Sequence, residues 1–271
     1  MKLNRFSLRG KAALITGGAG ILGSAISSGI AQAGADVAIA EIDFSKAKAL
    51  SKKIERTYNV KSCAIECDVS DPGSVKHMMA EAVKKLKRID ILFNNAASKA
   101  SNIKAFFAPF EKYSLDTWRE VTSVNIDGMF LVAQAAGNQM IRQGRGGVII
   151  QTGSIYGIVA PDQRTYKDSS YLGVKINSPA VYSASKGAVI ALSKYLAAYW
   201  ADKKIRVNTL IPGGIESGQN SIFKKKYSDR VPMKRMAKTD DMVGAAIYLA
   251  SDASKYATGL SLLIDGGLSI W

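Results

Sequence analysis

Short apolar runs alternate with longer segments of helical periodicity along the whole chain, and this alternation restricts the fold more than any other feature. The runs contain few polar residues, which is typical of strands that are buried on both faces. Buried strands joined by helices form a parallel sheet that helices cover on both sides. We expect seven strands, at Ala12–Thr16, Val37–Glu41, Ala64–Cys67, Ile89–Asn94, Val148–Thr152, Ile205–Ile211 and Leu260–Asp265.

The segments between these runs space their apolar residues as amphipathic helices do. The clearest are Ile21–Ala33, Val75–Leu86 and Asp240–Ala250. No internal repeat, low-complexity tract or linker divides the pattern, and 271 residues can form one α/β domain. We therefore predict a single doubly wound α/β domain over residues 1–271, with a mainly parallel sheet flanked by helices. Such sheets bind ligands at the carboxyl ends of their strands.

The chain is basic, with 37 lysines and arginines against 22 acidic residues and a net charge of +15. Such a charge attracts anions, from phosphorylated metabolites to nucleic acid. The basic residues are scattered and accompany no nucleic-acid-binding motif, which favours a solvated basic surface or a small anionic substrate. The two cysteines, Cys63 and Cys67, indicate no disulfide framework, and no apolar run is long enough to span a membrane. We expect a cytoplasmic protein.

A glycine-rich segment, Thr16–Gly23, connects the first expected strand to the first expected helix. Three of its glycines form a G-x-G-x-x-G pattern, which brings backbone amides and a helix N-terminus close to a pyrophosphate. Alone, the pattern is a weak indicator, because glycine-rich turns are common. Its place between a strand and a helix predicts a dinucleotide site, formed by Gly17, Gly18, Gly20, Ile21, Leu22 and Gly23.

Glu41 ends the second expected strand, 24 residues after Gly17. An acidic side chain there accepts hydrogen bonds from the 2′-hydroxyl of the adenine ribose and repels a 2′-phosphate. The next residue is Ile42 rather than arginine, and the glycine-rich segment contains no basic residue. The pattern favours NAD over NADP. The alternative is a solvated acid at the end of a strand.

Two tyrosines precede a lysine by four residues, Tyr171 before Lys175 and Tyr182 before Lys186. The first pair lies in a polar stretch. The second opens a segment rich in small residues that we predict to be a helix over Ala184–Ala201, and residues four apart on a helix share a face. Only a helix would hold the lysine rigidly beside the phenol. We therefore select Tyr182 and Lys186 as the catalytic pair.

Further motifs follow one another along the chain. They are Asp68-Val69 after the third strand, Asn94-Asn-Ala-Ala97 after the fourth, Asn125 in Val-Asn-Ile-Asp-Gly, Ser154 in Gln-Thr-Gly-Ser, Asn208 before Pro212-Gly-Gly-Ile215, and Ile264-Asp-Gly-Gly267 near the end. Together with the glycine-rich segment and the Tyr182/Lys186 pair, this series resembles the short-chain dehydrogenase/reductase family over nearly the whole chain. The resemblance implies a Rossmann fold, a nicotinamide cofactor and a homotetramer.

The resemblance also implies a catalytic set of Asn125, Ser154, Tyr182 and Lys186. Tyr182 would be the general acid and base, and Lys186 would lower the pKa of its phenol and bind the nicotinamide ribose. Ser154 would hydrogen-bond the reacting oxygen, and Asn125 would hold a water that links Lys186 to solvent.

The other cofactor contacts are likewise implied by the resemblance. Asp68 and Val69 would contact adenine, Asn94 the adenosine ribose, and Ile215 the carboxamide through its backbone. The chain has one histidine, His77, and its acidic residues are separated, so the sequence disfavours a metal site.

The chain departs from the family pattern in two informative places. Ile21 stands where most members with a Tyr/Lys pair of this kind have a second loop glycine, which leaves the shape of the phosphate-binding loop open. Ser154 and Tyr182 are 28 positions apart, farther than in the family, so we expect an insertion near residues 161–178 at the rim of the active site.

The expected insertion is mostly polar, which suits a hydroxylated ligand better than a steroid or an acyl chain. By the same resemblance, the segment near residues 214–236 would form the substrate lid. It contains Lys224, Lys225 and Lys226, and we expect these lysines to attract an anionic substrate.

The sequence therefore predicts an NAD-dependent oxidoreductase that interconverts a secondary alcohol and a ketone on a polar, sugar-like substrate, with phosphorylated and nucleotide-linked sugars among the candidates. The Pro161-Asp-Gln-Arg164 stretch and the Leu-Ser-Ile-Trp271 ending are similar to bacterial dehydrogenases of flagellin-modification and nonulosonic-acid pathways. One alternative is a 3-oxoacyl thioester reductase. Another is a catalytically silent NAD-sensing regulator, which would not need the intact catalytic set.

Overall fold

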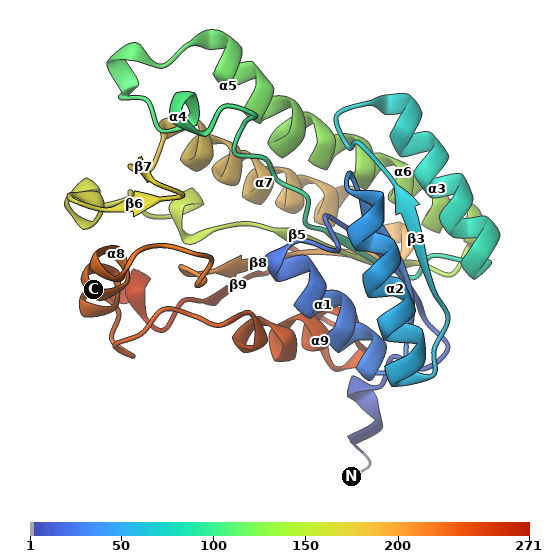
Figure 1. Ribbon diagram of the computed structural model, residues 1–271. Helices are drawn as coiled ribbons and strands as arrows, with labels where there is room; N and C mark the ends of the chain where they lie inside the picture. The colour runs from blue at the N-terminus through green and yellow to red at the C-terminus, as the bar shows by residue number, and fades with distance from the viewer. Residues whose placement is uncertain (1–2) are drawn as a thin grey trace.

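A seven-stranded parallel sheet forms the centre of the structure, a computed structural model that describes residues 3–271 (Figure 1). The strands are β1 (Ala12–Thr16), β2 (Asp36–Glu41), β3 (Ser62–Glu66), β4 (Ile91–Asn94), β5 (Gly147–Thr152), β8 (Ile205–Pro212) and β9 (Ser261–Ile264). Their order is β3-β2-β1-β4-β5-β8-β9, and every neighbouring pair is parallel. Each of the seven expected runs overlaps one strand, so the predicted doubly wound α/β fold is confirmed.

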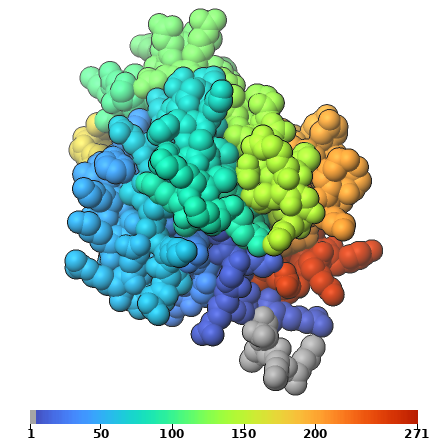
Figure 2. All heavy atoms as spheres, turned by 90° about the vertical axis from the view of Figure 1, so that its right-hand side faces the viewer, coloured from blue at the N-terminus to red at the C-terminus, as the bar shows by residue number. Residues whose placement is uncertain are grey.

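Helices cover both faces of this sheet, as Figure 1 shows. One face carries α1 (Ile21–Gln32), α2 (Phe44–Tyr58) and α9 (Val243–Ala250); the other carries α3 (Pro72–Leu86), α6 (Met129–Gln143) and α7 (Ala180–Tyr199). On this second face, α3 and α6 lie next to each other, as Figure 2 shows. None of the helices within residues 3–271 has the length and apolar character needed to cross a membrane.

The remaining helices are short. They are α4 (Ile103–Phe106), α5 (Leu115–Thr122), α8 (Ser221–Arg230), a π-helical segment η3 (Ser123–Gly128), and 3-10 turns at Leu3–Phe6, Phe110–Lys112, Ile155–Gly157, Gln163–Tyr166, Ala201–Lys203, Thr239–Met242, Asp252–Ser254 and Leu268–Ile270.

Local capping residues set the helix boundaries where they differ from the sequence prediction. Helix α3 begins at Pro72, three residues before the predicted start. The carboxylate of Asp71 accepts hydrogen bonds from the Gly73 and Ser74 amides, and proline fits the first turn because it lacks an amide hydrogen. Helix α7 likewise begins directly after Pro179. Apolar periodicity alone misses these first turns.

The strand order creates an opening at the carboxyl ends of the strands. Strand β1 lies between β2 and β4, so the chain leaves β1 toward one side of the sheet and leaves β4 toward the other. Doubly wound sheets bind their ligands at this topological switch point.

The segment near residues 161–178 folds into a compact unit at this end of the molecule. It contains a 3-10 turn and an antiparallel hairpin of β6 (Ser170–Tyr171) and β7 (Val174–Lys175). Leu172 and Gly173 form the connecting turn with positive φ angles of 50° and 77°, as a two-residue hairpin of this type requires. The hairpin faces α8 across the opening (Figure 1).

Candidate active site

A cleft of about 510 Å³ runs along the carboxyl ends of β1, β4, β5 and β8. The glycine-rich loop lines one end of it, and the hairpin and α8 line the other. Ser154, Tyr182 and Lys186 lie on its wall. The cleft therefore brings the predicted cofactor loop and three of the four predicted catalytic residues to one place.

The glycine-rich loop is packed too closely for side chains. A Cβ on Gly23 would lie 2.0 Å from the Gly17 carbonyl oxygen, and Gly17 itself has a φ of 58°. Gly20 caps α1 without any side-chain hydrogen bond, so the helix N-terminus faces the cleft with free backbone donors. This arrangement fits the pyrophosphate of a dinucleotide, which binds such donors.

Gly17, Gly20, Ile21, Leu22 and Gly23 line the cleft, whereas Gly18 does not. A Cβ on Gly18 would come within 2.8 Å of the Ile15 carbonyl oxygen, so this glycine allows the loop to pack on β1. Ile21 is 54% exposed at the rim. A side chain at this position is thus accommodated without displacing the loop.

Glu41 lines the cleft at the end of β2, where the sequence predicted a group that selects the cofactor. Its Oε2 accepts a hydrogen bond from the Ala19 amide at 3.2 Å, and its Oε1 accepts one from the Ile42 amide at 3.1 Å. These bonds tie the carboxylate to the glycine-rich loop. Its negative charge therefore lies beside the segment that fits a pyrophosphate.

The structure places Asn94 away from the cleft. Its side chain is 1% exposed, and its Nδ2 donates to the Met129 carbonyl at 2.8 Å. Asn95 lines the cleft instead, and its Nδ2 donates to the carbonyls of Thr16 and Gly17. The Asn94 side chain thus joins β4 to α6, and the expected contact of this residue with the adenosine ribose stays a prediction. A strand alternates its side chains, so one of two consecutive asparagines must face inward.

Asp68 and Val69 follow β3 and lie outside the lining of the cleft. The Asp68 carboxylate accepts hydrogen bonds from the amide and hydroxyl of Ser70, and Val69 is 7% exposed and packs against Gly128. Ile215 does line the cleft, where it forms a β-bridge with Ala237.

Ser154 and Tyr182 meet on the wall of the cleft. Ser154 follows β5, is 6% exposed, and its Oγ accepts a hydrogen bond from the Tyr156 amide at 3.2 Å. Tyr182 lies in the first turn of α7. Burial raises the pKa of the Tyr182 phenol, and its hydrogen bond with Ser154 lowers it in part.

Lys186 follows Tyr182 by one turn of α7 and is 3% exposed. Its Nζ donates to the Thr152 carbonyl at 2.8 Å and lies 5.9 Å from the centre of the Tyr182 ring. Burial lowers the pKa of the Lys186 ammonium to about 8. The ammonium is thus fixed beneath the phenol by the backbone of β5.

The family resemblance implied that Lys186 lowers the pKa of Tyr182, and the structure does not show this effect. The burial of the phenol has the larger influence and raises its pKa. The ammonium of Lys186 is directed toward the Thr152 carbonyl and lies 5.9 Å from the centre of the Tyr182 ring.

Asn125 lies in the π-helical segment η3, a helix type that often occurs at functional sites. Its Oδ1 accepts a hydrogen bond from the Ser98 amide at 2.8 Å, and its Nδ2 lies 3.5 Å from the Ser185 hydroxyl. Asn125 therefore connects the loop after β4 with α7, one residue before Lys186.

The second tyrosine–lysine pair is not brought together in the same way. Tyr171 lies on β6 opposite Val174, while Lys175 lies on β7 opposite Ser170 and is exposed. Tyr171 lines the cleft at the hairpin, but no helix holds Lys175 beside it.

Three further tyrosines line the substrate end of the cleft; Tyr166 belongs to the polar rim that the sequence predicts, whereas Tyr156 and Tyr227 were not identified from the sequence. The Tyr166 hydroxyl donates to the Tyr156 hydroxyl at 3.1 Å, and the Tyr227 hydroxyl accepts from the Gly214 amide. Burial raises the pKa of all three phenols, so they are neutral hydrogen-bonding groups. The spacing of Phe223 and Tyr227, one helical turn apart, could have identified the inner face of α8.

The lysines of α8 do not face the cleft, contrary to the expectation of a cationic lid. Lys224 forms an ion pair with Glu216 at 3.2 Å, Lys226 donates to the Lys167 carbonyl, and Lys225 is exposed. Phe223 and Tyr227 occupy the inner face of the helix. The helix packs its aromatic side chains inward, so its charged residues are left outside.

No group of three histidine, cysteine or carboxylate side chains within residues 3–271 is placed to hold a metal ion.

The chain matches known proteins along nearly its whole length. The family model described as Enoyl-(Acyl carrier protein) reductase matches residues 17–269. D-threitol dehydrogenase from Mycolicibacterium smegmatis is 34% identical over 98% of this chain and 95% of that protein. The 3-oxoacyl-[acyl-carrier-protein] reductase from Aquifex aeolicus is 30% identical over 96% of this chain and 98% of that protein.

The fold agrees with solved structures as well. A gluconate 5-dehydrogenase from Burkholderia cenocepacia, in complex with NADP and tartrate, is 33% identical over the full length of both chains with a TM-score of 0.87. Together with the parallel sheet and the glycine-rich loop beside Tyr182 and Lys186, these matches show that the chain belongs to the short-chain dehydrogenase/reductase family and is an oxidoreductase that acts on CH–OH groups with a nicotinamide cofactor.

Proposed function

We propose that this enzyme interconverts a secondary alcohol and a ketone on a polar, sugar-like substrate and uses NAD(H). The observation that supports this most directly is the position of Ser154, Tyr182 and Lys186 on one wall of the cleft, with the glycine-rich loop and Glu41 at its other end. The tyrosines, Gln219 and Asn177 at the substrate end offer hydrogen bonds to several hydroxyl groups.

In this proposal the protein positions the reacting oxygen and transfers its proton. When bound, the nicotinamide supplies the hydride chemistry. Tyr182 donates its phenolic proton to the carbonyl oxygen during reduction and removes the proton from the alcohol during oxidation. Ser154 donates a hydrogen bond to the same oxygen and keeps it within reach of the phenol.

Lys186 and Asn125 support this proton transfer. The ammonium of Lys186 is held by the Thr152 carbonyl at 2.8 Å, and by resemblance to the family it binds the nicotinamide ribose. Asn125 fixes the loop after β4 through the Ser98 amide at 2.8 Å, and by resemblance to the family it orders the water that reprotonates Lys186.

The preference for NAD rests on Glu41. The gluconate 5-dehydrogenase relative binds NADP, which carries a 2′-phosphate. The Glu41 carboxylate would repel this phosphate and so favour NAD. We expect a higher kcat/KM with NAD than with NADP, and Glu41→Ala should reduce the difference. Glu66→Ala removes an exposed acid from the end of the neighbouring strand and serves as the matched control. Equal use of both cofactors by the wild-type enzyme would contradict this assignment.

The sugar-like substrate is supported by the hydrogen-bonding side chains at the substrate end of the cleft and by the D-threitol and gluconate dehydrogenases among the relatives. The specific rival is a 3-oxoacyl thioester reductase, which the Aquifex aeolicus relative favours. The test is a competition at equal concentration between polyols, with gluconate and threitol included, and a 3-oxoacyl thioester. Preference for the thioester would remove the sugar hypothesis and leave the oxidoreductase in place. Catalytic turnover of either would exclude a silent regulator.

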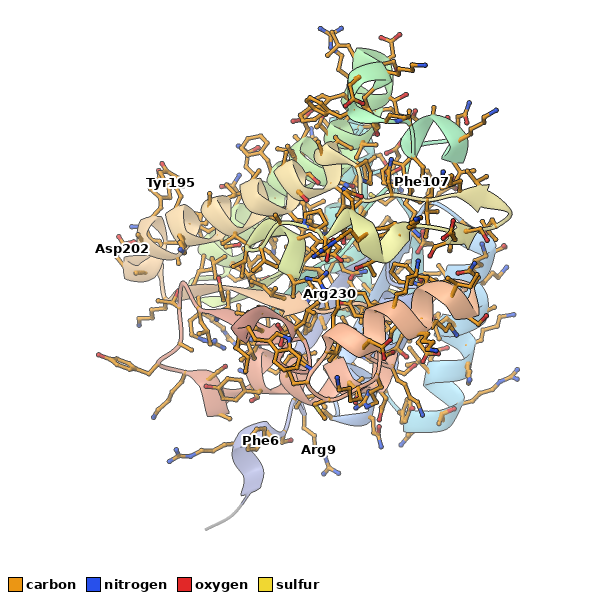
Figure 3. The ribbon with its side chains drawn as sticks, turned by 90° about the vertical axis from the view of Figure 1, so that its left-hand side faces the viewer. Phe6, Arg9, Phe107, Tyr195, Asp202 and Arg230 are labelled. Carbon is orange, nitrogen blue, oxygen red and sulfur yellow. The ribbon has the colours of Figure 1, made fainter. Side chains whose placement is uncertain are left out.

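We further propose a cytoplasmic homo-oligomer, a tetramer as is common in the family. Tyr195 and Tyr199 stack at 5.6 Å between ring centroids on the outer face of α7 and are 63% and 64% exposed (Figure 3 labels Tyr195). Large exposed aromatic residues favour an interface. Both cysteines are free, with pKa values raised to about 11 by burial, which suits a reducing compartment. A monomer in sedimentation at micromolar concentration would contradict the tetramer.

A further inference from the structure

We propose that Lys99 recognises an anionic group, a carboxylate or a phosphate, on a polyol substrate. The inference rests on the proposed function and names the substrate class more closely. It replaces the lysines of α8, which face away from the cleft, with a lysine from the loop after β4.

Lys99 is the charged side chain at the substrate end of the cleft. Of the side chains that line the cleft, three are charged: Glu41, Lys99 and Lys186. Glu41 is bonded to the glycine-rich loop, and Lys186 is bonded to Thr152 beneath Tyr182. Lys99 lies beside the hairpin instead. An anionic substituent would therefore meet one cation there and no carboxylate.

The hairpin holds the ammonium of Lys99 in place. Its Nζ lies 4.1 Å from the centre of the Tyr171 ring, within the range of a cation–π contact. Tyr171 is fixed in turn by its pairing with Val174 and its bridge to Gln219. The Tyr171 ring occupies one side of the ammonium, and the N–H groups of the ammonium on the other sides are available to a ligand.

The backbone around Lys99 is also constrained. The Ser98 amide donates to Asn125 Oδ1 at 2.8 Å, and the Ser101 amide donates to Glu120 Oε1 at 2.6 Å. Ala100 has a φ of 62°, which is unfavourable for a residue with a side chain, and its amide is held by the Ser98 hydroxyl at 3.0 Å. Strained backbone of this kind occurs preferentially at binding sites.

Lys99 differs from the lid lysines in its partners. Within residues 3–271 no carboxylate forms an ion pair with Lys99, whereas Lys224 is paired with Glu216 at 3.2 Å. Near the hairpin, Asn177 lines the same cleft with a buried Oδ1 that has no hydrogen-bond partner. A substrate with both an anionic group and free hydroxyls matches this combination of an unpaired cation and an unpaired acceptor.

The test measures binding rather than turnover. Enzyme saturated with NADH cannot oxidise an alcohol, so calorimetric titration with D-gluconate, D-glucitol 6-phosphate and D-glucitol reports affinity alone. These probes carry a carboxylate, a phosphate and no charge. We expect one of the anions to bind at least about 10-fold more tightly than glucitol, the scale of a hydrogen bond to a charged group. Lys99→Met should remove this difference and leave glucitol binding unchanged.

Lys225→Met is the control, because it removes the same charge from the exposed face of α8. An equal loss of anion affinity in Lys225→Met would overturn the proposal in favour of a general effect of surface charge. Glucitol binding as tight as that of both anions would also overturn it. If none of the three probes binds, the assignment of Lys99 fails, while turnover of another alcohol that depends on Tyr182 would leave the proposed function standing.

Discussion

The nucleotide half of the molecule (residues 12–152) and the substrate rim (residues 161–178 and 214–236) differ in how far polar contacts supplement their apolar packing. In the nucleotide half, fully buried apolar side chains such as Ile15, Ile39 and Phe93 pack between sheet and helices. In the substrate rim, Tyr166 of the hairpin segment packs against Phe223 of α8, with 5.2 Å between the ring centroids. Polar contacts add to this connection: the Arg230 guanidinium donates to the Thr165 hydroxyl, and the Asn220 amide donates to the Ser170 carbonyl. Figure 3 shows Arg230 between the two elements.

This difference indicates that the cofactor loop is held rigidly and that the substrate site tolerates change. Burial of each large apolar side chain contributes roughly 1.5–3 kcal/mol, so the nucleotide half holds the cofactor loop firmly. Exposed polar pairs contribute about 0–1 kcal/mol each, so changes that remove only these pairs of the rim alter the substrate site without unfolding the domain. The largest effects on activity should therefore come from the catalytic wall, and the smallest from the rim.

The first prediction concerns Tyr182, which lies on the wall of the cleft that both regions line. Tyr182→Phe should reduce kcat by at least about 100-fold, the contribution typical of a general acid and base. The variant keeps the ring and loses only the hydroxyl, so it removes no cofactor contact. NAD affinity measured by titration should therefore remain within about two-fold of wild type, a difference in binding free energy smaller than RT, which is about 0.6 kcal/mol.

Tyr171→Phe is the matched control, because Tyr171 lines the same cleft from the rim. It should change KM and leave kcat nearly unaffected. A collapse of kcat in Tyr171→Phe alone would mean that the hairpin tyrosine is the acid.

The second prediction uses the buried ammonium of Lys186. Lys186→Met should reduce kcat strongly and also change how stability depends on pH. The pKa of Lys186 is lowered to about 8 in the folded protein, from an ordinary value of 10.5. Between pH 8 and 10.5 the unfolded chain binds more protons, so the free energy of unfolding of the wild type rises with pH. Below pH 8 the full cost of the buried charge is present.

Lys186→Met should lack this rise, which amounts to on the order of 1–3 kcal/mol. Urea denaturation of both proteins at pH 7.5 and pH 10 would measure it. Parallel stability curves for the two proteins would show that the ammonium is not desolvated.

The sequence was sufficient for the nucleotide half because burial on both faces leaves a continuous apolar signal. Strand β1 matches its prediction residue for residue, and β5 differs by one residue. The glycine-rich loop was identified from its position, although only Gly17, Gly20 and Gly23 among its glycines line the cleft. Some glycines are needed for close packing, as Gly18 is against Ile15, and others are needed for contact with the cofactor. The sequence pattern does not distinguish the two kinds.

The substrate rim could be located but not oriented. The excess length between Ser154 and Tyr182 indicated an insertion, but pairing of two-residue strands depends on contacts with α8 that lie far away in sequence. The direction of the lid lysines was wrong because charge composition does not tell which face of a helix is buried. Lys99 was not identified from the sequence because its contact is with Tyr171, which lies 72 positions later in the chain.

The third prediction tests the close packing of the nucleotide half. Gly23→Ala places a Cβ 2.0 Å from the Gly17 carbonyl, so the loop must move. We expect a loss of about 1–3 kcal/mol in the free energy of unfolding and at least about a 10-fold loss in NAD affinity. Gly244→Ala is the control, because its Cβ would meet nothing within 4 Å on α9. Alanine in that helix should stabilise the protein by about 0.5–1 kcal/mol. Unchanged NAD binding in Gly23→Ala would argue against the loop as the pyrophosphate site.

The last and smallest effect concerns the contact between the hairpin segment and α8. Arg230 donates to the Thr165 hydroxyl at 3.3 Å and lies 3.8 Å from the Asp162 carboxylate. Arg230→Met removes both contacts and keeps an apolar stem, so KM should rise by about two- to five-fold while kcat stays constant, in line with a partly exposed ion pair. Arg164→Met removes the other partner of Asp162, a side chain that is 92% exposed and does not contact α8. If both variants raise KM equally, the charge of the rim matters and its attachment to α8 does not. A rise confined to Arg230→Met would show that joining the two rim segments shapes the substrate site.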